Sequence, residues 1–199
     1  MDFQKYAKHL RYYDNVLYDY HHKQVETNFY KILDKLGQPT GEYKAVFITL
    51  RLKGSSDWVS CNIASNALEW KLCKHYWKKK GKKMLINGTT PYIHSIETNH
   101  NRIKEHIHAL LLLKDLKTDY TDDEILDDIR KIALSLDEVN SRNPEVVRLR
   151  LFPFSMDTKE EATEVGNTLE YLCKTSSKQY DPLEKQPINQ TTQKRLKPL

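Results

Sequence analysis

The sequence predicts an α+β fold built around one antiparallel sheet. Four short segments are rich in β-branched, aromatic or leucine residues, as strands are. The segments between them repeat apolar residues every three or four positions, as amphipathic helices do. Their order is strand, helix, strand, strand, helix, strand. This order predicts a ferredoxin-like split β-α-β-β-α-β sheet with helices on one face, preceded by an N-terminal helical extension.

The extension is predicted from residues 2–36. Phe3, Tyr6 and Leu10 begin a series of apolar residues at helical spacing, and Gly37 follows its end. We therefore divide the chain into an extension at 1–40, a main domain at 41–180, and a tail at 181–199. The tail is polar and poor in apolar residues, so we expect it to be disordered.

The first strand and helix of the main domain follow the extension. Residues 44–52, KAVFITLRL, have the composition of a strand. A turn at 54–56 comes next, and Asp57 is placed to cap a helix that runs to about Lys80.

Two strands follow, at 91–98 and 106–113, joined by a polar link. The second of them, HIHALLLL, ends in four leucines without polar alternation. Such a run is typical of a central strand that is buried on both faces.

The last three elements are a helix, a strand and a helix. The helix at 121–136 is acidic and amphipathic, with Thr121 as its cap and Glu124 completing a capping box. A strand is predicted at 146–154 and a helix at 159–174.

Composition excludes some classes of protein. No stretch approaches 18 uncharged apolar residues, so we expect no membrane-spanning helix, and the N-terminus lacks the apolar region of a secretory signal. The three cysteines form no C-x-x-C pair, which favours a reducing cytoplasm over a disulfide framework. The net charge is only +5, but residues 69–83 hold seven lysines against one glutamate. Such a region could follow a phosphate backbone, or could be a solvated helix face.

Two histidines stand at the start of the leucine-rich strand. Because side chains alternate along a strand, His106 and His108 share a face, about 7 Å apart along the backbone. Two imidazoles at this spacing suit one metal ion, and burying them without partners would be costly. Glu97, at the end of the preceding strand, is the best candidate for a third ligand. His94 has the opposite parity on that strand, so it cannot face the metal together with Glu97.

A tyrosine and a lysine lie near the end of the last helix. Tyr171 and Lys174 are three residues apart and therefore share a helix face. A phenol is a poor nucleophile at neutral pH, but a nearby ammonium favours its phenolate or holds a phosphate under attack. The alternative is that Tyr171 is an ordinary core-facing residue.

These motifs resemble the HUH endonucleases. The His-hydrophobic-His strand HIHALLLL, followed by a helix with Tyr-x-x-Lys, is similar to the rolling-circle replication initiators of plasmids and small phages. The segment YLCKTSSKQY also looks like the initiators of filamentous phages. The resemblance covers roughly residues 44–180, and it implies that the main domain at 41–180 is an HUH nicking domain.

The resemblance implies a metal-dependent endonuclease that nicks and rejoins single-stranded origin DNA. His106, His108 and Glu97 would bind Mg²⁺ or Mn²⁺. Tyr171 would attack the phosphate, keep the 5′ end as a phosphotyrosine and free a 3′ hydroxyl, while Lys174 orients the phosphate or the phenol. The implied partners are single-stranded or hairpin origin DNA and a host helicase and polymerase, in the cytoplasm of a bacterial host cell.

The sequence departs from the larger initiators in two respects. Tyr180 lies nine residues beyond Tyr171, too far for a close tyrosine pair, and the chain has no phosphate-binding loop of a helicase. We expect mainly phosphate contacts to the DNA. The candidate basic residues are Arg51, Lys78, Lys79, Lys80, Arg148, Arg150 and Lys178.

Three alternatives remain open. The chain could be a non-catalytic module that binds single-stranded nucleic acid, although its central strand carries leucines where stacking aromatics would be expected. It could be a metal hydrolase that uses water on a His-His-Glu site. A structural zinc site at Cys61, Cys73 and His75 has a spacing that matches no common zinc module.

Overall fold

The computed structural model describes residues 30–53, 58–97, 106–116, 119–139, 143–173 and 188–189. Residues 30–36 are helical. The elements that follow are β1 (Lys44–Arg51), α3 (Trp58–Asn87), β2 (Tyr92–Glu97), β3 (His106–Leu113), α4 (Asp122–Leu134), η1 (Pro144–Val146), β4 (Val147–Pro153), α5 (Lys159–Cys173) and β5 (Ile188–Asn189).

The strands form one antiparallel sheet, so the fold is α+β. Across the described residues the strand order is β4-β1-β3-β2-β5, and every neighbouring pair is antiparallel. The two central strands, β1 and β3, pair over their full eight residues. The leucine-rich strand is buried on both faces as predicted, because only its first residue, His106, is partly exposed.

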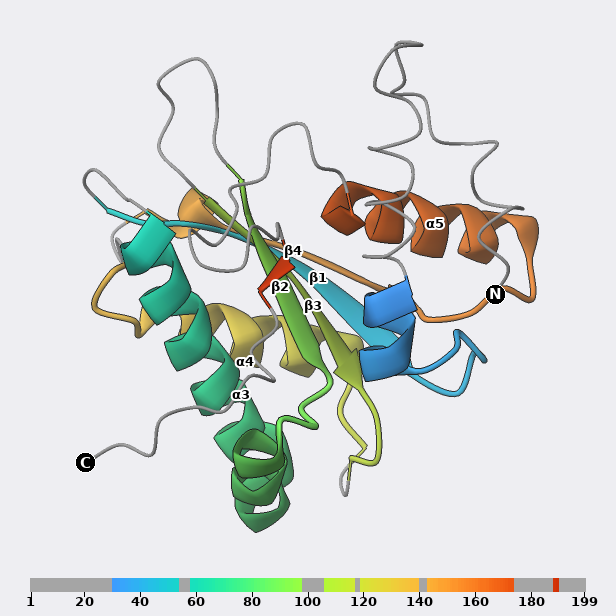
Figure 1. Ribbon diagram of the computed structural model, residues 1–199, viewed down its shortest axis with the longest axis horizontal. Helices are drawn as coiled ribbons and strands as arrows, with labels where there is room; N and C mark the ends of the chain where they lie inside the picture. The colour runs from blue at the N-terminus through green and yellow to red at the C-terminus, as the bar shows by residue number, and fades with distance from the viewer. Residues whose placement is uncertain are drawn as a thin grey trace, which may run out of the picture.

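Helices cover both faces of this sheet, so the prediction of helices on one face is wrong. Figure 1 shows α3 and α4 on one side and α5 with the helical segment 30–36 on the other. The two apolar clusters follow this division. Val46 and Ile48 of β1 pack with α3 and α4, whereas Ala45 packs with Leu169 of α5.

The cause is the composition of the central strands. Alternate residues point to opposite faces, and both sets are apolar over most of β1 and β3. A strand of this kind needs cover on both sides to remove its side chains from water.

Helix α3 is longer than predicted and contains a kink. It continues to Asn87 through Lys78, which has non-helical backbone angles (φ 48°, ψ −120°). The residues after the kink pass close to those before it. A Cβ atom at Gly81 would lie 2.1 Å from the carbonyl oxygen of Cys73, so only glycine allows this approach.

The start of α4 agrees with its prediction. The Thr121 hydroxyl accepts a hydrogen bond from the backbone N–H of Glu124, and the Glu124 carboxylate accepts one from the backbone N–H of Thr121. This is the predicted capping box, and it satisfies backbone donors that the first turn leaves without partners.

The ends of the chain are described only in part. Of the predicted extension at 1–40, residues 1–29 lie outside the described residues. Within the tail at 181–199, Ile188 and Asn189 form β5 and pair with Ser95 and His94 of β2. The edge of β2 offers the backbone groups for this pairing. None of the described helices is both long and apolar enough to cross a membrane.

Candidate active site

The register of the sheet brings the predicted metal ligands together. His106 and His108 lie on the α5 face of β3, the same face as Leu110. Glu97 of β2 stands directly opposite His106 in the antiparallel ladder, and Thr49 of β1 stands opposite His108. Directly opposite residues are close neighbours, so this register gathers the three ligands at one end of the sheet.

The three side chains form a compact and largely buried group. The Nε2 atom of His108 lies 2.9 Å from Oε2 of Glu97, and Nε2 of His106 lies 3.6 Å from the same oxygen. The side chains of His106, His108 and Glu97 are 12%, 5% and 10% exposed. Their ligand atoms all lie within 4.8 Å of one another, so the group could hold a metal ion. In the described part of the chain no second group of this kind occurs.

Tyr171 of α5 reaches the same group from above the sheet. Its hydroxyl donates a hydrogen bond of 2.7 Å to Oε2 of Glu97 and lies 3.4 Å from Nε2 of His108. Its ring packs edge-on against the rings of His108 and Phe47, with centroids 4.7 Å and 6.0 Å away. The predicted phenol is therefore in direct contact with two of the three predicted ligands.

Two residues that sequence reasoning missed hold His108 in place. The hydroxyl of Thr49 lies 3.1 Å from Nδ1 of His108, and the ring of Phe47 is stacked on the imidazole at 5.5 Å with an interplanar angle of 8°. If Nδ1–H donates to Thr49, the lone pair of Nε2 faces the metal position. The sequence signal for both residues is their shared parity on β1, which becomes informative only when the register between β1 and β3 is known.

Three predicted basic residues lie on the site's face of the sheet. Arg51 of β1 stands opposite His106, and Arg148 of β4 stands opposite Thr49, two strands from the histidines. Arg150 stands opposite Phe47, so the predicted shared face of the two β4 arginines is found. Arg51 and Arg148 give the end of the sheet near the metal group a positive flank, whereas the charge of Arg150 is paired with Glu164.

The predicted lysines Lys78, Lys79 and Lys80 are not brought to this site. They lie at the kink of α3, and Lys80 pairs with Asp115, which follows the end of β3. His106 is the first residue of that eight-residue strand, so roughly 23 Å of strand separates the two ends. Lys174, Lys178 and Tyr180 lie outside the described residues.

The residues of the alternative zinc site are used differently. Cys61 and Cys73 are buried in the apolar cluster under α3, and Nε2 of His75 pairs with Asp128 at 2.8 Å. His94, which has the opposite parity to Glu97, is fully buried on β2. These positions give no support to a second metal site in the described residues.

Comparison of the chain with protein-family models, curated proteins and solved structures finds no match. The chemistry open to this protein is therefore inferred from the geometry of Glu97, His106, His108 and Tyr171.

Proposed function

We propose that this protein is a metal-dependent endonuclease that nicks and rejoins single-stranded DNA through Tyr171. One observation carries the proposal. The Tyr171 hydroxyl lies 2.7 Å from Glu97 and 3.4 Å from His108, within a group of three side chains suited to a divalent metal. These residues come from three separate elements, and a tyrosine needed only for packing would not have to present its hydroxyl to metal ligands.

The donor set fits a divalent cation. Glu97, His106 and His108 would hold it with one carboxylate oxygen and two imidazole nitrogens. Imidazole donors suit Mn²⁺ better than Mg²⁺, which prefers oxygen ligands, so of the two expected ions we favour Mn²⁺. When bound, the ion would polarise the scissile phosphate and stabilise charge on the leaving oxygen.

The residues around the metal group supply the rest of the reaction. The Tyr171 oxygen attacks the phosphorus, a P–O bond to Tyr171 forms, and the P–O3′ bond breaks. The phenol proton leaves toward Glu97, which already accepts its hydrogen bond, and the 3′ oxygen ends protonated, so no proton is gained or lost overall. One phosphodiester replaces another, so the reverse reaction can rejoin the strand. Lys174 remains the proposed cation for orienting the phosphate or the phenol.

The fold is compatible with this proposal. The order β4-β1-β3-β2 agrees with a ferredoxin-like split β-α-β-β-α-β unit, to which β5 adds an edge strand. The substrate that we propose is single-stranded or hairpin origin DNA, and the physiological role is the start of rolling-circle replication in a bacterial cytoplasm. A host helicase and polymerase would continue from the freed 3′ hydroxyl.

A covalent adduct tests the proposal. The protein is incubated with single-stranded oligonucleotides and Mn²⁺, and a shifted protein band is sought on a denaturing gel. We expect the adduct to be lost in Tyr171→Phe and retained in Tyr120→Phe, a matched change beside α4, on the other face of the sheet. Mass spectrometry should place the DNA on Tyr171. An adduct on another residue would contradict the proposed role of Tyr171.

A metal hydrolase that uses water is the second candidate. It is favoured by the fact that Glu97, His106 and His108 form a complete ligand group without Tyr171. This candidate predicts cleaved DNA without an adduct, and unchanged cleavage in Tyr171→Phe. Binding of the oligonucleotide without cleavage in any divalent metal would instead favour a non-catalytic binding module.

A further inference from the structure

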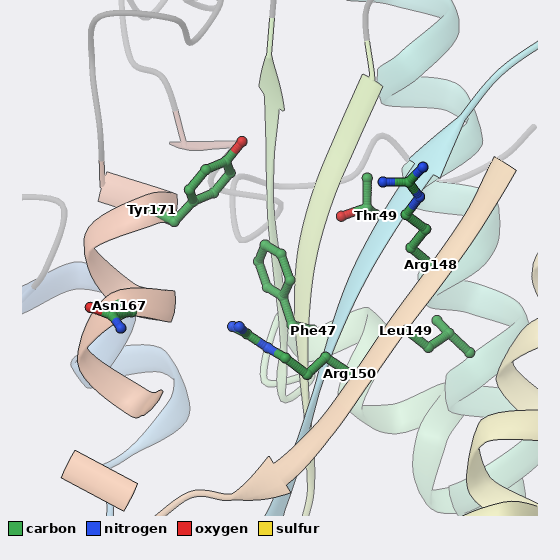
Figure 2. Close-up of a pocket in the computed structure, with 7 residues that line it drawn as sticks. All are labelled: Phe47, Thr49, Arg148, Leu149, Arg150, Asn167 and Tyr171. Atoms are coloured by element: carbon green, nitrogen blue, oxygen red, sulfur yellow. The ribbon is translucent and has the colours of Figure 1, made fainter. Parts of the chain in front are cut away.

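A cavity lies beside Tyr171, between α5 and the sheet. It has a volume of about 330 Å³, and residues of β1, β4 and α5 line it. Figure 2 shows Tyr171 and Asn167 on α5, facing Phe47 and Arg150 on the sheet, with Arg148 and Thr49 farther along the same face. The volume is at the lower end of the range for small-molecule sites.

One of the two arginines in this cavity is already held by α5. Arg150 pairs with Glu164 at 2.8 Å, donates a hydrogen bond of 2.7 Å to Thr168, and lies over the ring of Phe47 at 5.5 Å. Its guanidinium forms part of the cavity wall and keeps α5 close to the sheet.

Two polar side chains of the cavity have no such commitment. Among the described residues, neither the guanidinium of Arg148 nor the amide of Asn167 has a hydrogen-bond or ion-pair partner. Both residues are exposed. The cavity therefore offers a cation at one end and an amide with both donor and acceptor on α5. Between them, its wall is formed by the Phe47 ring and by the Arg150 guanidinium that lies over this ring.

We propose that this cavity binds one nucleotide of the single-stranded substrate, next to the phosphate that Tyr171 attacks. Arg148 contacts the adjoining phosphate, and the Asn167 amide hydrogen-bonds to the edge of the base. This inference rests on the proposed function, because it makes Tyr171 the shared boundary of the reaction site and the cavity.

The chemistry of the wall favours a nucleotide. A phosphate needs a cation, and arginine is well suited to it. An amide pairs with a base edge through one donor and one acceptor, and an aromatic or guanidinium surface accepts the flat face of a base. Arg148 lies two β-strands away from His108, a backbone separation of about 10 Å. A single DNA strand bound at the metal group can therefore also reach Arg148.

The position of Asn167 makes it a residue that determines sequence preference. It lies four residues before Tyr171, one turn away on the same face of α5. Phosphate contacts position a strand without reading its sequence, whereas the amide contacts a base. We therefore expect Asn167 to set the preferred base at one position beside the nick.

Binding without chemistry tests the role of Arg148. Tyr171→Phe protein is titrated with a fluorescent single-stranded oligonucleotide in EDTA at several salt concentrations. Adding Arg148→Gln should weaken binding about fivefold or more and reduce the slope of log affinity against log salt by about 0.7. Arg130→Gln on α4 is the matched control, because Arg130 is partly exposed and does not line the cavity. Equal effects of the two changes would overturn the assignment of Arg148.

Base preference tests the role of Asn167. The same metal-free binding reaction selects from oligonucleotides randomised at single positions, and the bound DNA is sequenced. Asn167→Leu should reduce a preference at one position by about fivefold or more, whereas Asn87→Leu at the end of α3 should not. An unchanged preference would overturn the base contact.

The two proposals can fail separately. Covalent adduct formation with base preferences unaffected by Asn167→Leu would leave the nickase standing and remove the nucleotide cavity. Binding that responds to Arg148→Gln and Asn167→Leu, with no adduct in Mn²⁺, would support the cavity and remove the nickase. Thermal melts of both variants exclude unfolding as the cause.

Discussion

The two faces of the sheet are built from alternate residues of the same strands, but they differ in what they enclose. On the α3 and α4 face, Ile48 and Leu50 of β1 are fully buried in an apolar cluster. On the α5 face, their neighbour Thr49 contacts His108, and the polar end of the face stays partly open. A shift of one residue along β1 therefore separates the main core from the candidate site.

Two tyrosines, one on each face of the sheet, show how the degree of burial affects a phenol group. Tyr92, whose hydroxyl hydrogen-bonds to Ser65 at 2.8 Å under α3, is fully buried, and burial raises the pKa of Tyr92 well above its ordinary value. That phenol keeps its proton and serves packing. Tyr171 is only partly buried and donates to a carboxylate at the edge of a cavity. The sealed face thus stabilises the fold, and the partly covered face holds the candidate site and its cavity.

The largest expected effect comes from one leucine truncation on each face. Leu68 of α3 and Leu169 of α5 are both fully buried. Each change to alanine should lower the free energy of unfolding by about 2–5 kcal/mol, through lost burial and a cavity. Only Leu169→Ala should also slow formation of the DNA adduct, because Leu169 seats the helix that carries Tyr171.

Urea unfolding measures the change in the free energy of unfolding of each variant. The adduct assay is performed under conditions where both variants are fully folded. Equal loss of adduct in Leu68→Ala and Leu169→Ala would show that the two faces are not functionally separate.

The second prediction concerns Thr49→Val, which keeps the shape of the side chain and removes its hydroxyl. His108 would lose the partner of its Nδ1 atom, and changes of this kind weaken metal binding by about 10- to 100-fold. The stability of the metal-free protein should also fall, by about 1 kcal/mol or more, because the buried His108 loses a hydrogen bond. Titration with Mn²⁺ followed by electron paramagnetic resonance measures the affinity. Thr89→Val, at an exposed residue of the loop before β2, is the control, and an equal effect there would remove the role assigned to Thr49.

Part of the site could be predicted from the sequence because its signals are local. The shared face of His106 and His108 follows from alternation along one strand, and the capping box at Thr121 follows from four consecutive residues. The convergence of Tyr171 with the histidines was expected from the resemblance to a family, not from periodicity. The structure places these residues in contact, while their chemistry stays a prediction.

The features of the site that the sequence could not predict depend on contacts between segments that are distant along the chain. Thr49 and His108 are 59 positions apart, and only the register of β1 against β3 brings them together. The cover of α5 on the second face and the distance of the Lys78–Lys80 cluster from the site are likewise tertiary properties. A lysine run looks the same in sequence whether it lies beside a metal group or at the far end of a sheet.

A smaller effect is expected from the link between α5 and β4. Glu164 pairs with Arg150, and both side chains are partly exposed, so Glu164→Gln should cost at most about 1 kcal/mol of stability. The difference from the unmodified protein should shrink in high salt, because exposed charges are screened. Thermal melts at low and high salt measure it. If the loss of stability in Glu164→Gln did not depend on salt, then Glu164 and Arg150 would hold α5 against the sheet by packing and not by charge.

The smallest predicted effect lies on the sealed face, at the start of α4. Hydrogen bonds from the backbone N–H and the hydroxyl of Thr121 hold the pKa of Glu124 below its ordinary value. The folded protein therefore binds this proton less readily than the unfolded chain, and ionised Glu124 contributes stability above the unfolded pKa of about 4.3. That contribution is lost as the pH falls through the lower folded value. Melting temperatures of the protein and of Glu124→Gln should differ at pH 7 and converge in acid. If the difference in melting temperature stayed constant with pH, the negative charge of Glu124 would not contribute to this cap. The contribution of Glu124 would then come from its hydrogen bonds alone.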